Sequence, residues 1–195
     1  MNSNDDRRLY DFVYRAMLTE EALDVAGRHN RGDNSEEAVE LVEALSFQLF
    51  DDDLLARARL MSTVYTAIAA FEMSVRRFVK KVLIDTYEED WWEKGVSEKI
   101  RKFVEARRVD EEKVKWHGTR GDDLLDYTEL GHLPQIMQQN WQYFDAYVPR
   151  VDWATALFST FERSRNVIMH SGSLSLPDVE RIGMHIRDWN KQVAL

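Results

Sequence analysis

Arg165 and His170 are the residues of this chain whose types and spacing could do chemistry. On a helical wheel, at about 100° per residue, the apolar side chains of residues 153–169 fall on one arc, and Arg165 lies near its centre. Burying a guanidinium without a partner is costly, so Arg165 should either pair inside the core or face an anion. His170 follows at the expected end of the same helix. An arginine that holds a phosphate and a histidine that moves a proton are a minimal set of groups for cleaving RNA.

A second charged residue lies where an apolar one is expected. The spacing of apolar residues predicts one long helix from about Asp53 to Tyr87, and Glu72 lies inside its apolar arc. Glu72 and Arg165 could form a structural ion pair across the bundle, which alone would say nothing of function. Alternatively, Glu72 could orient Arg165 or His170 and leave the arginine partly free for phosphate. The sequence leaves both interpretations open.

Glu162, Asn166 and His170 lie four residues apart along one row of the expected helix, next to Arg165. They form a polar strip at the border of an apolar face, which favours a functional site. A histidine in the last turn of a helix can also simply complement the helix dipole and its free carbonyl groups.

The pattern is helical nearly throughout, without alternation of the β type. Expected helices cover about residues 7–26, 35–50, 53–87, 97–115, 134–147 and 152–172, and a last one begins near Pro177. Residues 116–131 are expected to form a structured loop. Pro134 favours a helix start and Gly172 a helix end. The predicted fold class is therefore an all-α bundle.

Composition narrows the function classes. The 195 residues suffice for one domain with or without an appendage, and the chain contains no cysteine. Disulfides, thiol nucleophiles and cysteine-ligated zinc are thus excluded. The five histidines are scattered, and His117 and His132 have no helical partner at ligand spacing, so no metal site is expected.

The net charge of −9 argues against a protein that coats nucleic acid non-specifically, but it allows RNA as the substrate of a small, locally basic cleft. No apolar run is long enough for a membrane span, and the polar start is unlike a signal peptide. A cytoplasmic protein without membrane contact is expected.

The run from Arg165 to His170 resembles the Arg-x4-His signature of the HEPN superfamily, including the polar Asn166 directly after the arginine. Further segments resemble the branch of this superfamily that is also found fused to PIN-type nuclease domains in RNA surveillance: residues 61–65, 71–76, 91–92, 115–118, 125–127, 140–144 and 177–189. The resemblance covers roughly residues 53–192. Residues 1–50 are therefore interpreted as an added N-terminal helical hairpin, and residues 51–195 as the HEPN-like domain.

The resemblance implies a four- to five-helix bundle that usually dimerises and brings two Arg/His motifs into one cleft. Active members are metal-independent endoribonucleases without a cofactor, in which the ribose 2′-hydroxyl attacks the phosphate and leaves a 2′,3′-cyclic phosphate. His170 would be the general acid or base, and Arg165 would stabilise the charge on the phosphate. In support, Asn166 would hydrogen-bond the phosphate or hold the histidine, and Glu72 would brace the arginine. Beyond this motif, Glu162 is expected to support the site, and His117 and Arg76 are candidates for contacting the RNA.

One position departs from the pattern. Superfamily toxins that are paired with nucleotidyltransferase antitoxins often carry a modified tyrosine two residues after the histidine, where this chain has Gly172. Regulation of that kind is not expected here, although a toxin–antitoxin or antiviral-defence role, with an antitoxin or defence-system partner, fits the superfamily. Two alternatives remain. The chain could be a non-catalytic HEPN module that binds RNA, nucleotide or a protein partner, or a helical dimerisation scaffold.

Overall fold

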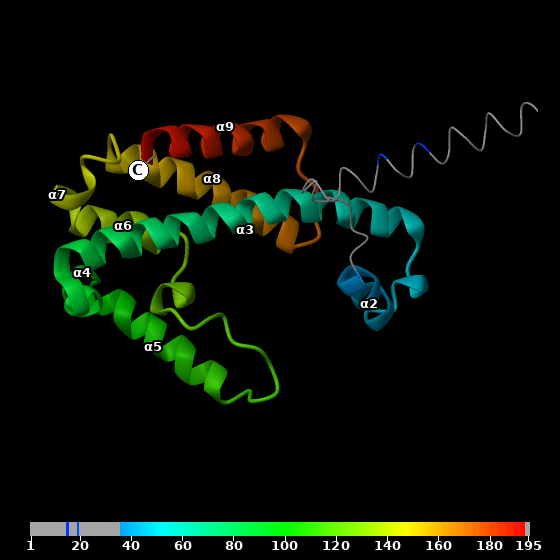
Figure 1. Cartoon of the computed structure of the whole chain (residues 1–195), viewed down its shortest axis with the longest axis horizontal. Coiled ribbons are helices and arrows are strands. Elements are labelled where there is room, and N and C mark those ends of the chain that lie inside the picture. Colours follow the sequence, from blue (N-terminus) through cyan, green and yellow to red (C-terminus); the bar gives the residue numbers. More distant parts are fainter. Residues whose placement is uncertain (1–14, 16–18, 20–35, 194–195) are drawn as a thin grey trace, which may run out of the picture. The chain divides into compact units, whose positions relative to one another are not determined.

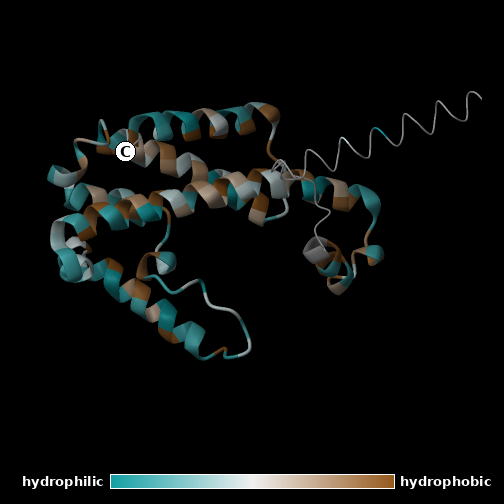
Figure 2. Ribbon diagram, viewed as in Figure 1, coloured by the Kyte–Doolittle hydropathy of each residue, from teal (hydrophilic) through white to brown (hydrophobic). Residues whose placement is uncertain are grey.

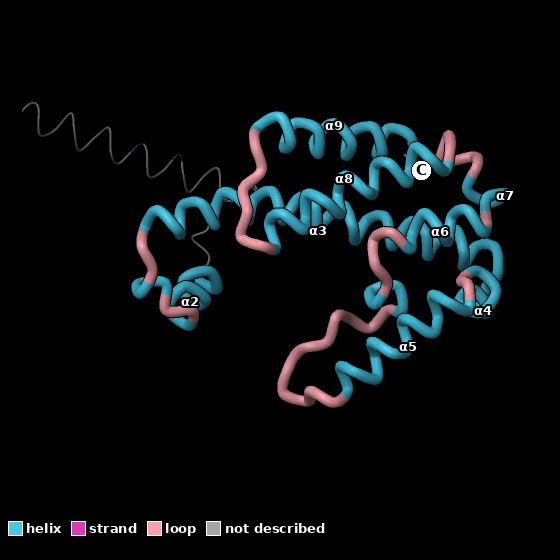
Figure 3. Tube along the Cα trace, turned by 180° about the vertical axis from the view of Figure 1, so that it is seen from behind, coloured by secondary structure: helices cyan, strands magenta, loops and turns pink. Residues whose placement is uncertain are grey.

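The structure, a computed structural model, describes Arg15, Thr19 and residues 36–193. All regular elements of these residues are helices (Figures 1 and 3). The helix expected over residues 7–26 lies outside the described residues, apart from Arg15 and Thr19. The chain divides into two compact units, Met1–Asp52 and Asp53–Leu195. None of the described helices is long and apolar enough to cross a lipid bilayer.

In the first unit, the described helix is shorter than expected. Helix α2 (Glu36–Ala44) ends before Ser46, which adopts a left-handed conformation with φ of 55°. A short 3₁₀ helix, η1 (Phe47–Leu49), follows. The single helix predicted over residues 35–50 is therefore wrong, because the left-handed residue breaks the α-helical hydrogen-bond ladder. The interpretation of residues 1–50 as an added hairpin stays a prediction.

Helix α3 (Asp52–Tyr87) is the axis of the second unit, and it confirms the expected long helix. Helices α8 (Val151–Met169) and α9 (Leu176–Val193) run beside it in Figure 1. Four aromatic side chains join the three helices. The ring of Phe71 on α3 stacks on Phe161 with centroids 4.1 Å apart, and it lies 6.1 Å from Phe158 and 5.9 Å from Trp189. These buried rings form the centre of the core, where both large apolar area and aromatic geometry stabilise the fold.

The remaining elements follow the C-terminal end of α3 in the chain and lie between α3 and α8 in the sequence. Their bounds are η2 (Glu88–Asp90), α4 (Trp91–Gly95), α5 (Glu98–Glu112), η3 (Leu124–Tyr127), α6 (His132–Gln139) and α7 (Trp141–Phe144). Figure 2 shows apolar residues gathered on parts of these helices and polar residues along the rest. Inside the expected loop 116–131, the side chain of Asp123 accepts a hydrogen bond from the Leu125 amide and caps η3. The all-α fold class is confirmed.

Asn140 explains why the helix predicted over residues 134–147 is in fact two helices. Its side chain is buried, and its amide group donates to the carbonyl oxygens of Gly95 (2.7 Å) and Ile136 (2.8 Å). Its Oδ1 accepts a hydrogen bond from the Tyr87 hydroxyl at 2.9 Å. The chain turns at Asn140 because the side chain competes with the backbone for these partners. One residue thus ties the ends of α3, α4 and α6 together.

We expect Asn140→Ala to lower the free energy of unfolding by about 2 to 4 kcal/mol, because the Gly95 carbonyl and the Tyr87 hydroxyl lose their buried partner. Urea denaturation followed by circular dichroism measures this loss. Asn190→Ala, at an exposed position of α9, is the matched control and should change stability by less than about 0.5 kcal/mol. Equal effects of the two substitutions would contradict this role of Asn140.

Candidate functional site

Glu72 is a buried carboxylate that two arginines share. Its Oε1 lies 3.2 Å from Nη2 of Arg76, one turn further along α3, and 3.8 Å from Nη1 of Arg165 on α8. Only 8 % of Glu72 is exposed. The pairing expected between Glu72 and Arg165 is therefore present, but Arg76 is the nearer partner.

The donors of Arg76 are directed to protein atoms. Its Nε donates to the carbonyl of Leu125 at 3.0 Å, and its Nη2 donates to the carbonyl of Thr128 at 3.1 Å as well as to Glu72. Arg76 thereby fastens η3 and the following turn to α3. This geometry favours a positioning role for Arg76 over the expected contact with RNA.

Arg165 lies at the edge of the apolar face rather than at its buried centre, because 37 % of its side chain is exposed. At 3.8 Å its contact with Glu72 is an ion pair and is too long for a hydrogen bond. Its Nε is buried and has no hydrogen-bond partner among the described residues. Arg165 is thus held by charge, and the exposed part of its side chain, which does not include Nε, remains accessible to an anion.

His170 is the exposed residue that ends α8, and a specific turn follows it. The amide of Ser171 donates to the carbonyl of Ile168 (2.9 Å), and the amide of Gly172 donates to that of Val167 (2.8 Å). This is the Schellman pattern of helix termination. The left-handed residue of the turn is Ser171, with φ of 59°, rather than the expected glycine.

Gly172 is required for a different reason. A Cβ atom at this position would lie 2.8 Å from both the carbonyl oxygen and a methyl carbon of Val167. The helix end was thus predicted at the right place, but the glycine serves close approach of two backbone segments.

The structure separates other expected site residues from His170. Glu162 lies against Gly131 at the start of α6, and eight residues of α8 put it about 12 Å from His170 along the helix axis. His117 is exposed on the loop that follows α5, and this loop lies apart from the end of α8 in Figures 1 and 3. Asn166 stays near the motif, since it is exposed and its carbonyl accepts the His170 amide at 3.1 Å.

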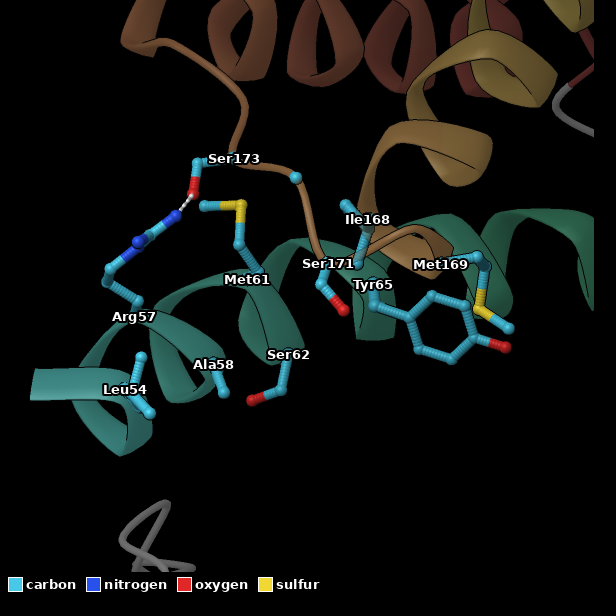
Figure 4. A pocket seen from close by; sticks show the side chains of 11 residues that line it. Leu54, Arg57, Ala58, Met61, Ser62, Tyr65, Ile168, Met169, Ser171 and Ser173 are labelled. Carbon is cyan, nitrogen blue, oxygen red and sulfur yellow. Dashed lines mark hydrogen bonds between the residues drawn. The ribbon is translucent and has the colours of Figure 1, made fainter. Parts of the chain in front are cut away.

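A cavity of about 520 Å³ lies beside the end of α8 and was not foreseen from the sequence (Figure 4). It is lined by Leu54, Arg57, Ala58, Met61, Ser62 and Tyr65 of α3 and by Ile168, Met169, Ser171, Gly172 and Ser173. The α3 residues share one face by their helical spacing, which is a signal the sequence contains. Their apposition to residues 168–173 is a tertiary feature. Among the described residues, no group of three or more His, Cys, Asp or Glu side chains could hold a metal ion.

The family model of Swt1-like HEPN domains matches residues 66–194, well over half of the chain. The matched range contains Glu72, Arg165 and His170. The chain belongs to the HEPN superfamily. HEPN domains are often ribonucleases or nucleotide-binding modules, and they often dimerise and bind RNA. No curated protein and no solved structure matches the chain.

Two substitutions at neighbouring positions of the turn after His170 should have opposite effects on the stability of this HEPN domain. Ser171→Gly should raise the free energy of unfolding by about 1 kcal/mol, because glycine adopts the left-handed conformation without steric cost. Gly172→Ala should lower it, since the new methyl group would overlap Val167. Thermal and urea denaturation of both variants measure the two shifts. A loss of stability in Ser171→Gly would contradict this account of the turn.

The surroundings of His132, at the start of α6, indicate that the stability of the HEPN fold depends on pH. Its Nδ1 accepts a hydrogen bond from the Glu129 amide at 3.1 Å, which requires the neutral ring. Burial lowers the pKa of His132 below the ordinary histidine value, and the neighbouring charges act in both directions. Arg107 and Lys99 lower the pKa further, whereas Glu129 and Glu162 oppose the shift.

Because the folded state disfavours the protonated ring, the stability that His132 contributes is present above the ordinary histidine pKa and is lost as the pH falls towards the lowered one. The free energy of unfolding should therefore decrease from pH 7 to pH 5, and His132→Gln should reduce this slope. Urea denaturation across this range measures it. His117→Gln, at an exposed histidine, is the control and should keep the wild-type slope; an unchanged slope in His132→Gln would refute the assignment.

Proposed function

We propose that this protein is a metal-independent endoribonuclease whose active site contains Arg165 and His170 and is completed at a cleft between two copies of the chain. The observation that carries the proposal is the state of Arg165. It is held by Glu72 through charge, it is partly exposed, and its Nε forms no hydrogen bond within the part of the chain that the structure describes. His170 is exposed five residues later, so both groups are accessible to an RNA phosphate.

The charges around Glu72 favour an anionic ligand. One carboxylate stands against two guanidinium groups, so the cluster retains one positive charge in a chain whose net charge is −9. Arg76 donates hydrogen bonds to two backbone carbonyls and to Glu72, and these bonds fix the position of the carboxylate. Arg165 is the member of the cluster that remains for the phosphate.

In the proposed reaction, the ribose 2′-oxygen forms a bond to phosphorus while the bond from phosphorus to the 5′-oxygen breaks. The products are a 2′,3′-cyclic phosphate and a 5′-hydroxyl. A histidine takes the proton of the 2′-hydroxyl, and a proton must reach the departing 5′-oxygen on the opposite side. Arg165 stabilises the negative charge that grows on the phosphate, and Asn166 offers a further hydrogen bond.

This proton balance supports a dimer. Attack and departure occur on opposite sides of the phosphorus, so one imidazole is poorly placed to serve both oxygens. Two copies of the chain would supply two His170 side chains to one cleft, one as the base and one as the acid. The partner in this proposal is a second identical chain, in line with the frequent dimerisation of HEPN domains.

The biological setting we propose is that of a toxin or antiviral-defence effector that acts on cytoplasmic RNA and is restrained by an antitoxin or a defence-system partner. This part of the proposal is supported by the frequency of such roles in the superfamily.

The test is cleavage of total RNA and of tRNA by the purified protein in EDTA. We expect the wild type to cut and to leave 2′,3′-cyclic phosphate ends. His170→Ala and Arg165→Ala should each lower the rate by at least about 100-fold, because each removes a group that acts in the transition state. Arg165→Lys should also be impaired, since lysine keeps the charge but loses the planar fork that binds phosphate.

Arg163→Ala is the matched control, because it removes an exposed arginine from the same helix and should leave cleavage unchanged. His117→Ala reports separately on the loop histidine. If the folded, dimeric wild type cuts no RNA while it binds RNA or nucleotide, the chain is a non-catalytic HEPN module. Equal cutting by wild type and His170→Ala would exclude the proposed chemistry.

A further inference from the structure

We propose that the cavity between the first half of α3 and the end of α8 binds one nucleobase of single-stranded RNA, namely that of a nucleotide next to the phosphate at Arg165 and His170. The inference rests on the proposed function for the identity of that phosphate. The cavity's volume, about 520 Å³, falls within the range of small-ligand sites, about 300–1,000 Å³. It is large enough for a base together with its ribose.

The walls of the cavity are suited to a flat aromatic ligand. Tyr65 presents its ring on one side and is 36 % exposed, so its surface is open to a stacking partner. Tyr65 and Met169 both line the cavity, and in the view of Figure 4 they lie at the same end of it. Thioether groups are polarisable and pack well against aromatic rings. Met169 is 59 % exposed at the surface of α8, so its side chain is open to contact with a ligand.

The polar groups of the cavity suit the edge of a base. Three serines, Ser62, Ser171 and Ser173, contribute hydroxyl groups. The Ser62 hydroxyl donates to the Arg59 carbonyl at 2.7 Å and so offers a ligand an acceptor. By contrast, Ser173 Oγ accepts from Arg57 and offers its proton. Bases present donors and acceptors side by side along their edges, so hydroxyl groups can pair with them in more than one arrangement. The walls thus combine apolar faces with a few polar groups, which is the usual composition of a ligand site.

The charge of the cavity favours a ligand that carries phosphate. Among the described residues that line it, Arg57 is the one charged residue, and none of them is acidic. The Nη2 of Arg57 donates to Ser173 Oγ at 3.5 Å, a long contact that leaves the guanidinium group able to bind an anion. Arg57, through its contact with Ser173, lies at the turn after His170, whereas Arg165 lies on α8 before His170.

The position of the cavity ties it to the Arg/His motif. Met169 and Ser171 line it, and His170 stands between them in the chain. Arg165 lies about one helical turn before Met169. A base in the cavity therefore belongs to a nucleotide adjoining the phosphate held at the motif, and the cavity would select the base at the cleavage site.

Binding is tested with short single-stranded RNA that carries 2′-O-methyl riboses and cannot be cut. Fluorescence anisotropy compares the wild type with Tyr65→Ala, Tyr65→Phe and the control Met73→Ala, an exposed apolar residue of α3 outside this cavity. Tyr65→Ala should weaken binding between about 5-fold and about 100-fold, because a stacked base loses its aromatic partner. Tyr65→Phe and Met73→Ala should bind nearly as the wild type does. Arg57→Ala should lower the dependence of log affinity on log salt by about 0.7, the value for one lost phosphate contact on a single strand.

Cleavage mapping is the second readout. On a pool of random RNA sequences, the wild type should prefer certain bases next to the cleaved bond, and Tyr65→Ala should lose that preference while still leaving cyclic phosphate ends. If Tyr65→Ala binds and cuts like Met73→Ala, the base site is refuted while the nuclease stands. Tyr65→Ala could also lose RNA binding because it no longer dimerises, and light scattering would then show a monomer where the wild type is a dimer. In that case the cavity belongs to an interface between copies, and the inference is overturned. If the wild type binds RNA through Tyr65 but never cuts it, the base site stands and the nuclease fails.

Discussion

The shared carboxylate of Glu72 connects the separate parts of this domain. Arg76 joins it to η3 and the turn that follows, because the same guanidinium group also binds the carbonyls of Leu125 and Thr128. Arg165 joins it to α8. A buried anion of this kind is stable only with its cations in place, and removing one member of a buried ion pair typically costs about 3 to 5 kcal/mol. The core helices and the motif are therefore coupled through one side chain.

The two arginines are not equivalent partners. Arg76 lies closer to Glu72 and is satisfied by protein atoms, whereas Arg165 is more exposed, more distant and has a buried Nε without a partner among the described residues. In a domain that served only as a scaffold, stability would increase if the hydrogen-bond donors of both arginines were paired with protein atoms. The asymmetry is what a binding site for an anion requires, because the cation must be held in place without being neutralised completely.

The turn after α8 serves both the motif and the cavity. Ser171 in its left-handed conformation and Gly172 in close contact with Val167 end the helix at His170 and return the chain towards α3. There the amide of Leu174 contacts the sulfur atom of Met61 at 3.3 Å. The same few residues thus set the position of the histidine and form one wall of the cavity, so a change in this turn would affect both.

Periodicity in the sequence by itself determined the all-α class, the long helix α3, the end of α8 and the two charged residues, Glu72 and Arg165, on otherwise apolar faces. Such local signals depend on residues within a few helical turns. Only the tertiary structure decided that Arg76 is fixed by the carbonyls of Leu125 and Thr128, that Glu162 turns to α6, and that Asn140 divides a helix. These outcomes depend on partners far along the chain, since a helical pattern states which face is buried but not which atoms meet it. The cavity beside His170 exists for the same reason, because neither α3 nor the turn after α8 encloses it alone.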